Sequence, residues 1–179
     1  MKTIIESIRI LIVFTLLTGV LYPLAVTGVA KAFFRRQSDG SLVVQDGKIV
    51  GSALLAQKFD NPRYFAPRPS AADFATVASG ASNKGPTSGD LAKAIGERRA
   101  KLGPGAPGDL LTASGSGLDP HISPAAAEFQ LPRVAAERKM PPEKISALVR
   151  QFTEPPQFGI LGEPRVNVFA LNLALDALR

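Results

Sequence analysis

The chain has 179 residues, 45% of them hydrophobic, which is enough for one domain with a core of its own. Its 15 prolines and 16 glycines predict a globular part rich in loops and turns. There is no cysteine and only one histidine, His121, so the chain lacks the residues for a disulfide, a thiolate nucleophile or a multi-histidine metal site.

The formal net charge of +6 is concentrated beside an apolar N-terminal stretch. Five basic residues flank that stretch against Glu6 alone, and the remainder, from Gln37 onward, has 16 basic and 14 acidic residues. A globular part that is nearly neutral has no surplus of cations for a phosphate backbone. The charge distribution therefore argues against nucleic-acid binding.

Residues 10–30 form an uncharged stretch of 21 residues. As a helix it is about 30 Å long, the thickness of the hydrocarbon core of a bilayer, and Arg35 and Arg36 follow as a polar stop. Ala30-Lys31-Ala32 resembles a signal-peptidase site, but the apolar stretch is too long for a signal core and a lysine lies inside the site. We expect a retained membrane anchor. Basic residues occur on both sides, so charge leaves its orientation open.

The globular part begins with a predicted β-hairpin over residues 41–55, whose turn is Asp46-Gly47. A short extended segment is expected at residues 64–65, and residues 79–90 form a polar, glycine-rich loop. A helix is predicted from Leu91 to a stop at Gly103.

Ser123-Pro124 has the residue types of a helix N-cap and first turn, and we expect Pro132 to break or kink the helix that follows. Further elements are predicted as a helix starting at residues 141–143, a strand at residues 166–168 and a helix over residues 171–178. A hairpin followed by helices indicates an α+β domain.

Three catalytic interpretations find little support. Ser116 with Asp119 and His121 lacks the glycine spacing of a nucleophile elbow. The loop at residues 79–90 lacks the P-loop order of glycine and lysine, because Lys84 precedes Gly85. A single span encloses no pore, and no phosphorylation motif of a P-type ATPase is present. The sequence alone favours an accessory protein without a self-contained active site.

Several collinear segments resemble one family, the C subunit of the Kdp potassium-transporting ATPase, KdpC. They are GSALLAQKF (51–59), YF (64–65) with RPS (68–70), SGASN (79–83), TASGSGLDPHISP (112–124), QLPRVA (130–135), GEPRVNV (162–168) and LNLALD (171–176). The resemblance covers essentially the whole chain. One departure is Ala81, where the family typically has a second glycine.

The resemblance implies a four-subunit complex in the bacterial inner membrane. The expected partners are a channel-like potassium-translocating subunit, a P-type ATPase subunit and a small single-span subunit, besides membrane lipid. It implies a cytoplasmic N-terminus (residues 1–9), a transmembrane helix (10–30) and a periplasmic α+β domain (31–179). The family role is that of a catalytic chaperone that raises the ATP affinity of the ATPase subunit. ATP is thus implied through that subunit, and no tightly bound cofactor or metal is expected.

A periplasmic domain cannot touch cytoplasmic ATP, so we expect the domain to cap the channel-like subunit and to act on ATP affinity allosterically. Polar residues in the family motifs are the candidates for partner contact: Arg68, Ser70, Ser82, Asn83, Ser116, Asp119 and Asn167. For each of them the simpler role is to shape a turn or to cap a helix. A membrane-anchored binding module of another envelope complex stays open as the alternative function, and a membrane-tethered hydrolase comes third.

Overall fold

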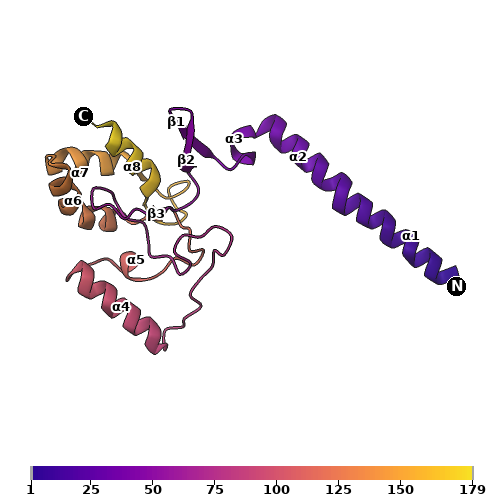
Figure 1. Ribbon diagram of the computed structural model, residues 1–179, viewed down its shortest axis with the longest axis horizontal. Coiled ribbons are helices and arrows are strands. Elements are labelled where there is room, and N and C mark those ends of the chain that lie inside the picture. Colours follow the sequence, from indigo (N-terminus) through magenta and orange to yellow (C-terminus); the bar gives the residue numbers. More distant parts are fainter. Residues whose placement is uncertain (1, 179) are drawn as a thin grey trace. The chain divides into compact units, whose positions relative to one another are not determined.

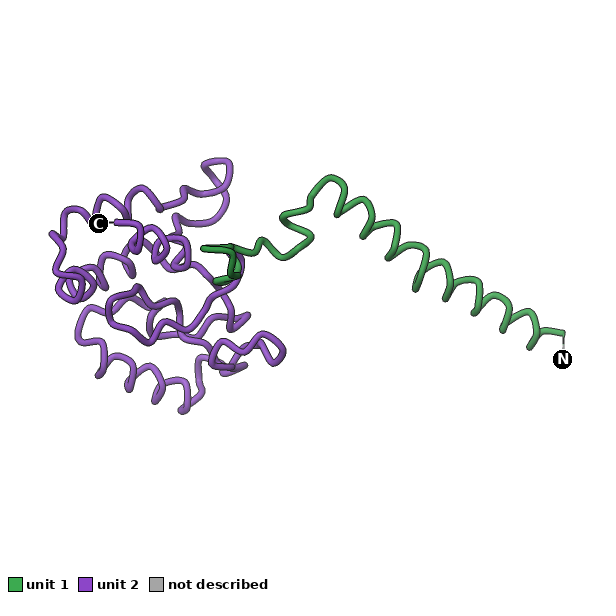
Figure 2. The backbone as a smooth tube through the Cα atoms, turned by 45° about the horizontal axis from the view of Figure 1, so that its top comes forward, with its two compact units in different colours: residues 1–52 green, residues 53–179 purple. Residues whose placement is uncertain are grey.

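A computed structural model describes residues 2–178, and the chain divides into two compact units, residues 1–52 and 53–179 (Figure 2). The division falls after Ser52, so the N-terminal helix and the hairpin belong to one unit. The second unit holds all the motif segments except Gly51 and Ser52, the first two residues of the segment 51–59.

The first unit opens with a continuous helix from Lys2 to Phe33 (Figure 1). A π-helical turn, η1, lies directly before Pro23, which has no N–H to donate to a carbonyl four residues back. The N–H of the preceding Tyr22 bonds to the carbonyl of Leu17, five residues back, and the helix continues. Its parts are α1 (Lys2–Leu16), η1 (Leu17–Leu21) and α2 (Tyr22–Phe33).

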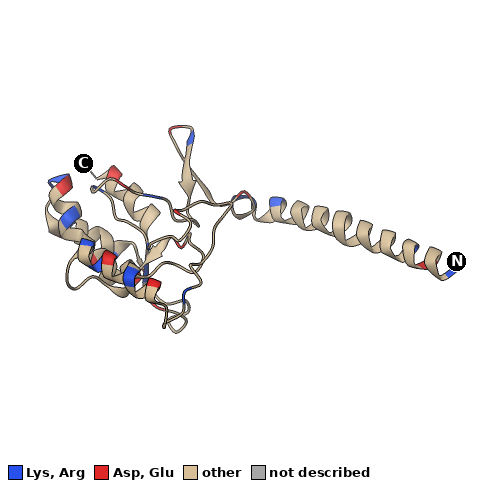
Figure 3. Cartoon of the chain, turned by 60° about the horizontal axis from the view of Figure 1, so that its bottom comes forward, with Lys and Arg blue, Asp and Glu red and all other residues tan. Residues whose placement is uncertain are grey.

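This helix buries none of its side chains within the described part of the chain. Its charged residues lie near its two ends, and the long stretch between them is uncharged (Figure 3). A helix that is apolar on all faces belongs in lipid or among other helices. The predicted apolar helix is confirmed and extends beyond residues 10–30 at both ends, so it is long and apolar enough to cross a membrane.

The hairpin is confirmed. A short helix, α3 (Arg35–Ser38), leads into β1 (Leu42–Gln45) and β2 (Lys48–Ser52), which pair antiparallel. Asp46 and Gly47 both have positive φ, 50° and 74°, as a two-residue type I′ turn requires.

The second unit is built from helices around a small antiparallel sheet of strand order β3-β5-β4. The α+β class is therefore confirmed. The helices are α4 (Gly89–Leu102), α5 (Gly108–Leu111), α6 (Pro124–Arg138), α7 (Pro142–Gln151) and α8 (Val168–Ala177), and the strands are β3 (His121–Ile122), β4 (Thr153–Glu154) and β5 (Arg165–Asn167).

The core of this unit lies where α6, α7 and α8 pack against one another and against the sheet. Phe65, from the irregular segment before α4, is completely buried in it. The other fully buried large apolar side chains of the described residues are Ile122, Val134, Ile145, Val166, Val168, Leu171 and Leu175. All of these residues lie within residues 53–179, so the unit has a core of its own.

Local signals set several helix ends. Ser88, Ser123 and Asn167 each accept a hydrogen bond from a backbone N–H of the first turn of α4, α6 and α8. Gly103, with φ 94°, ends α4 as predicted. The final helix starts at Val168 and not at residue 171, because Asn167 ends β5 and caps α8 at the same time.

Pro132 was expected to break or kink the helix, and of these two effects the break is wrong. Helix α6 runs from Pro124 to Arg138 through the proline as one element. Val134 and Ala135, in the turn after the proline, are buried in the core. Their packing holds that turn helical although Pro132 donates no hydrogen bond.

Candidate functional site

The motif segment at residues 58–70 belongs to no regular element, and its backbone is held by side chains. The buried amide of Asn172 accepts from the N–H of Phe65 and donates to its carbonyl, both at 2.9 Å. Gln130 does the same for Ala66, at 2.8 and 3.0 Å. Each amide thus pairs with a peptide group as a neighbouring strand would. Gln130 and Asn172 are structural clamps that the sequence reasoning missed.

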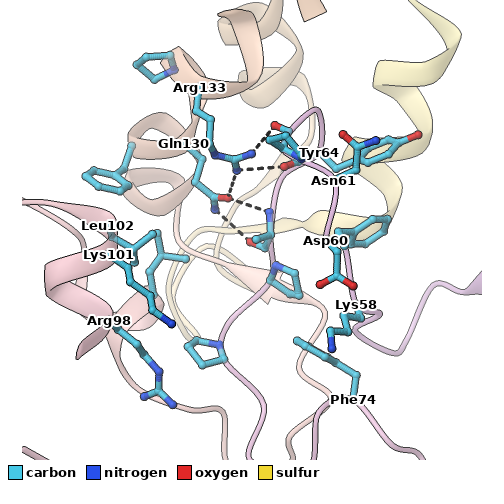
Figure 4. Close-up of a pocket in the computed structure, with 18 residues that line it drawn as sticks. Lys58, Asp60, Asn61, Tyr64, Phe74, Arg98, Lys101, Leu102, Gln130 and Arg133 are labelled. Carbon is cyan, nitrogen blue, oxygen red and sulfur yellow. Dashed lines mark hydrogen bonds between the residues drawn. The ribbon is translucent and has the colours of Figure 1, made fainter. Parts of the chain in front are cut away.

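Two arginines extend this framework. Arg133 donates through Nη1 to the carbonyl of Pro62 and through Nη2 to the carbonyl of Tyr64 at 3.0 Å (Figure 4). Burial lowers the pKa of the Arg133 guanidinium from its usual value. Arg138 donates to Asp176 at 2.7 Å, and its guanidinium lies 4.9 Å from the ring centre of Tyr64. These cations are engaged by the fold itself.

An open groove of about 730 Å³ lies beside the clamped segment (Figure 4). Four cationic side chains line it, and three of them have partners within the chain. Lys58 lies 2.9 Å from Asp73, Arg98 donates to the carbonyl of Leu111 at 2.7 Å, and Arg133 holds the clamped segment; the fourth is Lys101. The rest of the lining is mainly apolar. Its aromatic and aliphatic lining includes Phe59, Tyr64, Phe74, Leu102, Leu110 and Phe129.

Two of the predicted contact residues form an ion pair across 51 residues of sequence. Arg68 Nη1 donates to Asp119 Oδ2 at 3.2 Å, and the other oxygen, Oδ1, accepts the N–H of His121 at 3.0 Å. Burial raises the pKa of the Asp119 carboxyl, but the hydrogen bonds from His121 and Arg68 outweigh it and bring the pKa below its usual 3.8. Asp119 is thus held as a carboxylate at neutral pH.

The ion pair lines a cleft of about 340 Å³ that also holds Glu163 and Arg165. The side chains of Arg68 and Asp119 keep 27% and 29% of their surface exposed there. Arg68 Nε is buried and has no acceptor within residues 2–178. The cleft is polar, of mixed charge and accessible, which suits it to contact with another molecule.

Ser70 and Ser116 shape turns. The hydroxyl oxygen of Ser70 accepts the N–H groups of Ala72 and Phe74, at 3.2 and 3.0 Å, and that of Ser116 accepts the N–H of Leu118 at 3.1 Å. The lone pairs of both hydroxyls are thus turned toward their own backbone. This is the simpler of the two roles expected for them.

The remaining predicted residues do not line the cleft of the ion pair. Asn167 caps α8 and donates to the carbonyl of Ala53 at 2.8 Å. Asn83 is exposed and has φ 52°, a conformation that asparagine tolerates well. Ser82 lines a separate hollow with Lys84 and Arg98. Within residues 2–178 no cluster of three or more acidic or histidine side chains is placed to hold a metal ion.

The similarity to known proteins extends over nearly the whole chain. Residues 4–177 match the family model described as "KdpC: K+-transporting ATPase, c chain". A protein of Variovorax paradoxus named potassium-transporting ATPase KdpC subunit is 55% identical over 171 residues, which covers 90% of this chain and 89% of the relative.

Two further relatives have the same name. One from Polaromonas naphthalenivorans is 52% identical over 190 residues, covering 100% of this chain and 97% of its own, and one from Gemmatimonas aurantiaca is 51% identical over 176 residues, covering 91% and 86%. The match includes the apolar helix, the clamped segment and the Arg68–Asp119 cleft alike. The chain belongs to the KdpC family, the c chains of K+-transporting ATPases.

Proposed function

We propose that this chain is a non-catalytic accessory subunit that assembles and stabilises an ATP-driven, high-affinity potassium-uptake complex. The observation that carries the proposal is the family match over residues 4–177 in a chain whose apolar helix buries none of its side chains. A lone apolar helix encloses no pathway for an ion, but it packs against membrane helices of larger subunits. The partners we propose are the channel-like subunit, the P-type ATPase subunit and the small single-span subunit of the Kdp complex.

The proposed topology is a single pass through the bacterial inner membrane, with the N-terminus in the cytoplasm and the second unit in the periplasm. Since the chain has no cysteine, a single introduced thiol reports its own side of the membrane. Val77 is fully exposed, so Val77→Cys is expected to react with a membrane-impermeant maleimide added to spheroplasts. Lys2→Cys is the matched control and is expected to react only after the membrane is opened. The reverse pattern would contradict the topology.

We further propose that the chain raises the apparent affinity of the ATPase subunit for ATP, and that it does so allosterically. The domain lies across the membrane from ATP in the proposed topology, so it acts by favouring one conformation of the complex. The groove beside the clamped segment agrees with this, because its lining is mainly apolar and three of its four cationic side chains already have partners in the chain. No tightly bound cofactor is proposed for this chain.

The test is potassium-stimulated ATP hydrolysis by the purified complex, measured against ATP concentration with and without this chain. Assembly that depends on the chain, and a lower KM for ATP in its presence, are the expected results. Unchanged assembly and kinetics would contradict the accessory role. Binding of labelled ATP to the chain alone, as tight as to the complex, would leave the role intact but overturn the allosteric route.

A further inference from the structure

A short loop between β4 and β5 exposes an apolar tip. Residues 155–162 fold back on themselves through a bridge between Gln157 and Leu161, whose N–H and carbonyl groups bond to each other at 2.9 Å in both directions. Phe158 and Gly159 at its tip have φ 56° and 78°. The N–H of Gly159 also bonds to the carbonyl of Pro156 at 2.9 Å. We name residues 155–162 the finger.

The finger presents three large apolar side chains to solvent. Phe158 is 83% exposed, Ile160 82% and Leu161 56%. Single exposed apolar residues are common, but three within four residues of one closed turn favour burial against a partner. Because hydrogen bonds already fix the turn, little conformational entropy is lost when a partner covers it.

The finger adjoins the cleft of mixed charge described above. Glu163 and Arg165, which follow the finger, line that cleft together with Arg68 and Asp119. On the other side of the finger Glu154 is paired with Arg165 at 3.0 Å. An apolar tip beside paired charges of both signs has the anatomy of a protein interface, in which apolar anchors are surrounded by a polar rim.

The same features argue against a lipid surface as the occupant. Segments that insert into an anionic membrane surface have an excess of lysine or arginine near their apolar residues. Here Glu154 and Glu163 balance Arg165, and the finger contains neither tryptophan nor tyrosine. A protein surface that has an apolar pocket and charged groups of both signs fits the finger better than a lipid surface does.

We propose that the finger inserts Phe158 and Ile160 into an apolar pocket of another subunit of the potassium-transporting complex, while the Arg68–Asp119 cleft contacts the polar rim of that pocket. This inference rests on the proposed function, because it presumes a complex with other subunits. The inference identifies the finger as a part of the chain that binds another subunit.

The experiment replaces Phe158 with the photoreactive residue p-benzoylphenylalanine in the full-length chain within the complete complex. The matched control has the same residue at Val77, which is equally apolar, fully exposed and far from the finger in sequence. On irradiation, position 158 is expected to crosslink to one protein subunit, and position 77 is expected to give at least tenfold less of that product. Crosslinking of position 158 to lipid alone, or equal products at both positions, would overturn the proposal.

A second variant measures the energetic role of the tip. The double variant Phe158→Ser and Ile160→Ser is expected to dissociate from the complex roughly tenfold faster or more, as is typical when interface anchors are removed. Because both side chains are exposed, its thermal unfolding is expected to match that of the wild type. Dissociation as slow as that of wild type would reject the finger as a contact with another subunit, while the accessory function would still stand. Failure of the wild-type chain itself to co-purify would instead reject the accessory function.

Discussion

Gly117 is the residue at which two motif loops come into contact. It has φ 72°, and a β-carbon built on it would lie 2.9 Å from the carbonyl oxygen of Gly80 and 3.3 Å from the hydroxyl oxygen of Ser70. The first contact is with backbone, which cannot swing aside. The loops at residues 79–83 and 112–124 therefore depend on the absence of a side chain at this position.

Gly117→Ala is expected to destabilise the chain by about 1–3 kcal/mol, since the variant adds both a strained φ and a backbone clash. Thermal unfolding of the purified chain in detergent measures the change. Gly115→Ala in the same loop is the control, because its φ is not positive and nothing lies within 4 Å of its β-carbon. Equal losses in the two variants would show that the contact with Gly80 is not what requires glycine.

Asp119 makes the folding stability of the domain depend on pH in the acid range. Its pKa is lower in the folded chain than in the unfolded one, so its ionised form favours folding. The contribution is complete above the ordinary carboxyl pKa of 3.8 and is lost as the pH falls through the lower, folded value. Asp119→Asn is expected to lower stability by about 1 kcal/mol at neutral pH, because its bonds to Arg68 and His121 are partly shielded from water.

The difference in melting temperature between wild type and Asp119→Asn is expected to shrink as the pH falls below 4. Asp73→Asn is the matched control, since Asp73 also pairs with a cation, Lys58, but its side chain is 74% exposed. Exposed pairs contribute little, so this variant should differ little from wild type at any pH. A constant difference for Asp119→Asn across the acid range would contradict the role given to its charge.

At the scale of the element, Pro132 marks a conflict between local preference and packing. It stands in the interior of α6, where it supplies no N–H to the carbonyl of Glu128, yet the helix continues. Pro132→Ala restores that donor and is expected to stabilise the chain by about 1–2 kcal/mol, after the greater freedom of the unfolded variant is subtracted.

Thermal unfolding again provides the measurement, with Pro124→Ala in the same helix as the control. Pro124 occupies the first turn, where proline fits without loss of a hydrogen bond, so its replacement should give no gain. A loss of stability in Pro132→Ala would mean that the ring, which lines the groove, contributes more by packing than the missing bond costs.

Elements whose ends are set by nearby residues could be predicted from the sequence. Asp46-Gly47 forces the hairpin turn, Ser123 caps α6 and Gly103 ends α4, each through bonds or backbone angles within a few residues. Strands β3 and β4 could not be predicted, because each has two residues and exists only through pairing with β5. Such pairing depends on tertiary structure and leaves no period in the sequence.

The same limit applies to the site. The motifs pointed to Arg68 and Asp119 separately, but no local pattern joins residues 51 positions apart. Gln130 and Asn172 were missed because a polar residue in a helix is normally exposed, whereas these two are 96% or more buried against a segment 64 and 107 residues away. The motifs QLPRVA and LNLALD contained both residues, so their presence was visible although their role was not.

At the scale of the whole molecule, stability and membrane attachment belong to different parts of the chain. Every residue of the buried core cluster lies between Phe65 and Leu175, inside the second unit. The helix from Lys2 to Phe33 contributes no buried side chain, so its apolar surface is free to be covered by lipid or by other membrane helices.

A chain that begins at Ala53 is therefore expected to fold without the helix or the hairpin. It should remain soluble without detergent and unfold in one cooperative transition within a few degrees of the full-length chain, because it keeps the core, the clamps at Phe65 and Ala66, and the Asn167 bond to Ala53. Circular dichroism against temperature measures this.

Added to a complex that lacks this subunit, the shortened chain is expected to bind more weakly than the full-length chain, since it lacks the helix packed in the membrane. A shortened chain that melts without cooperativity would show that the first unit is part of the fold, and one that restores ATP hydrolysis fully would show that the helix is dispensable for the function proposed here.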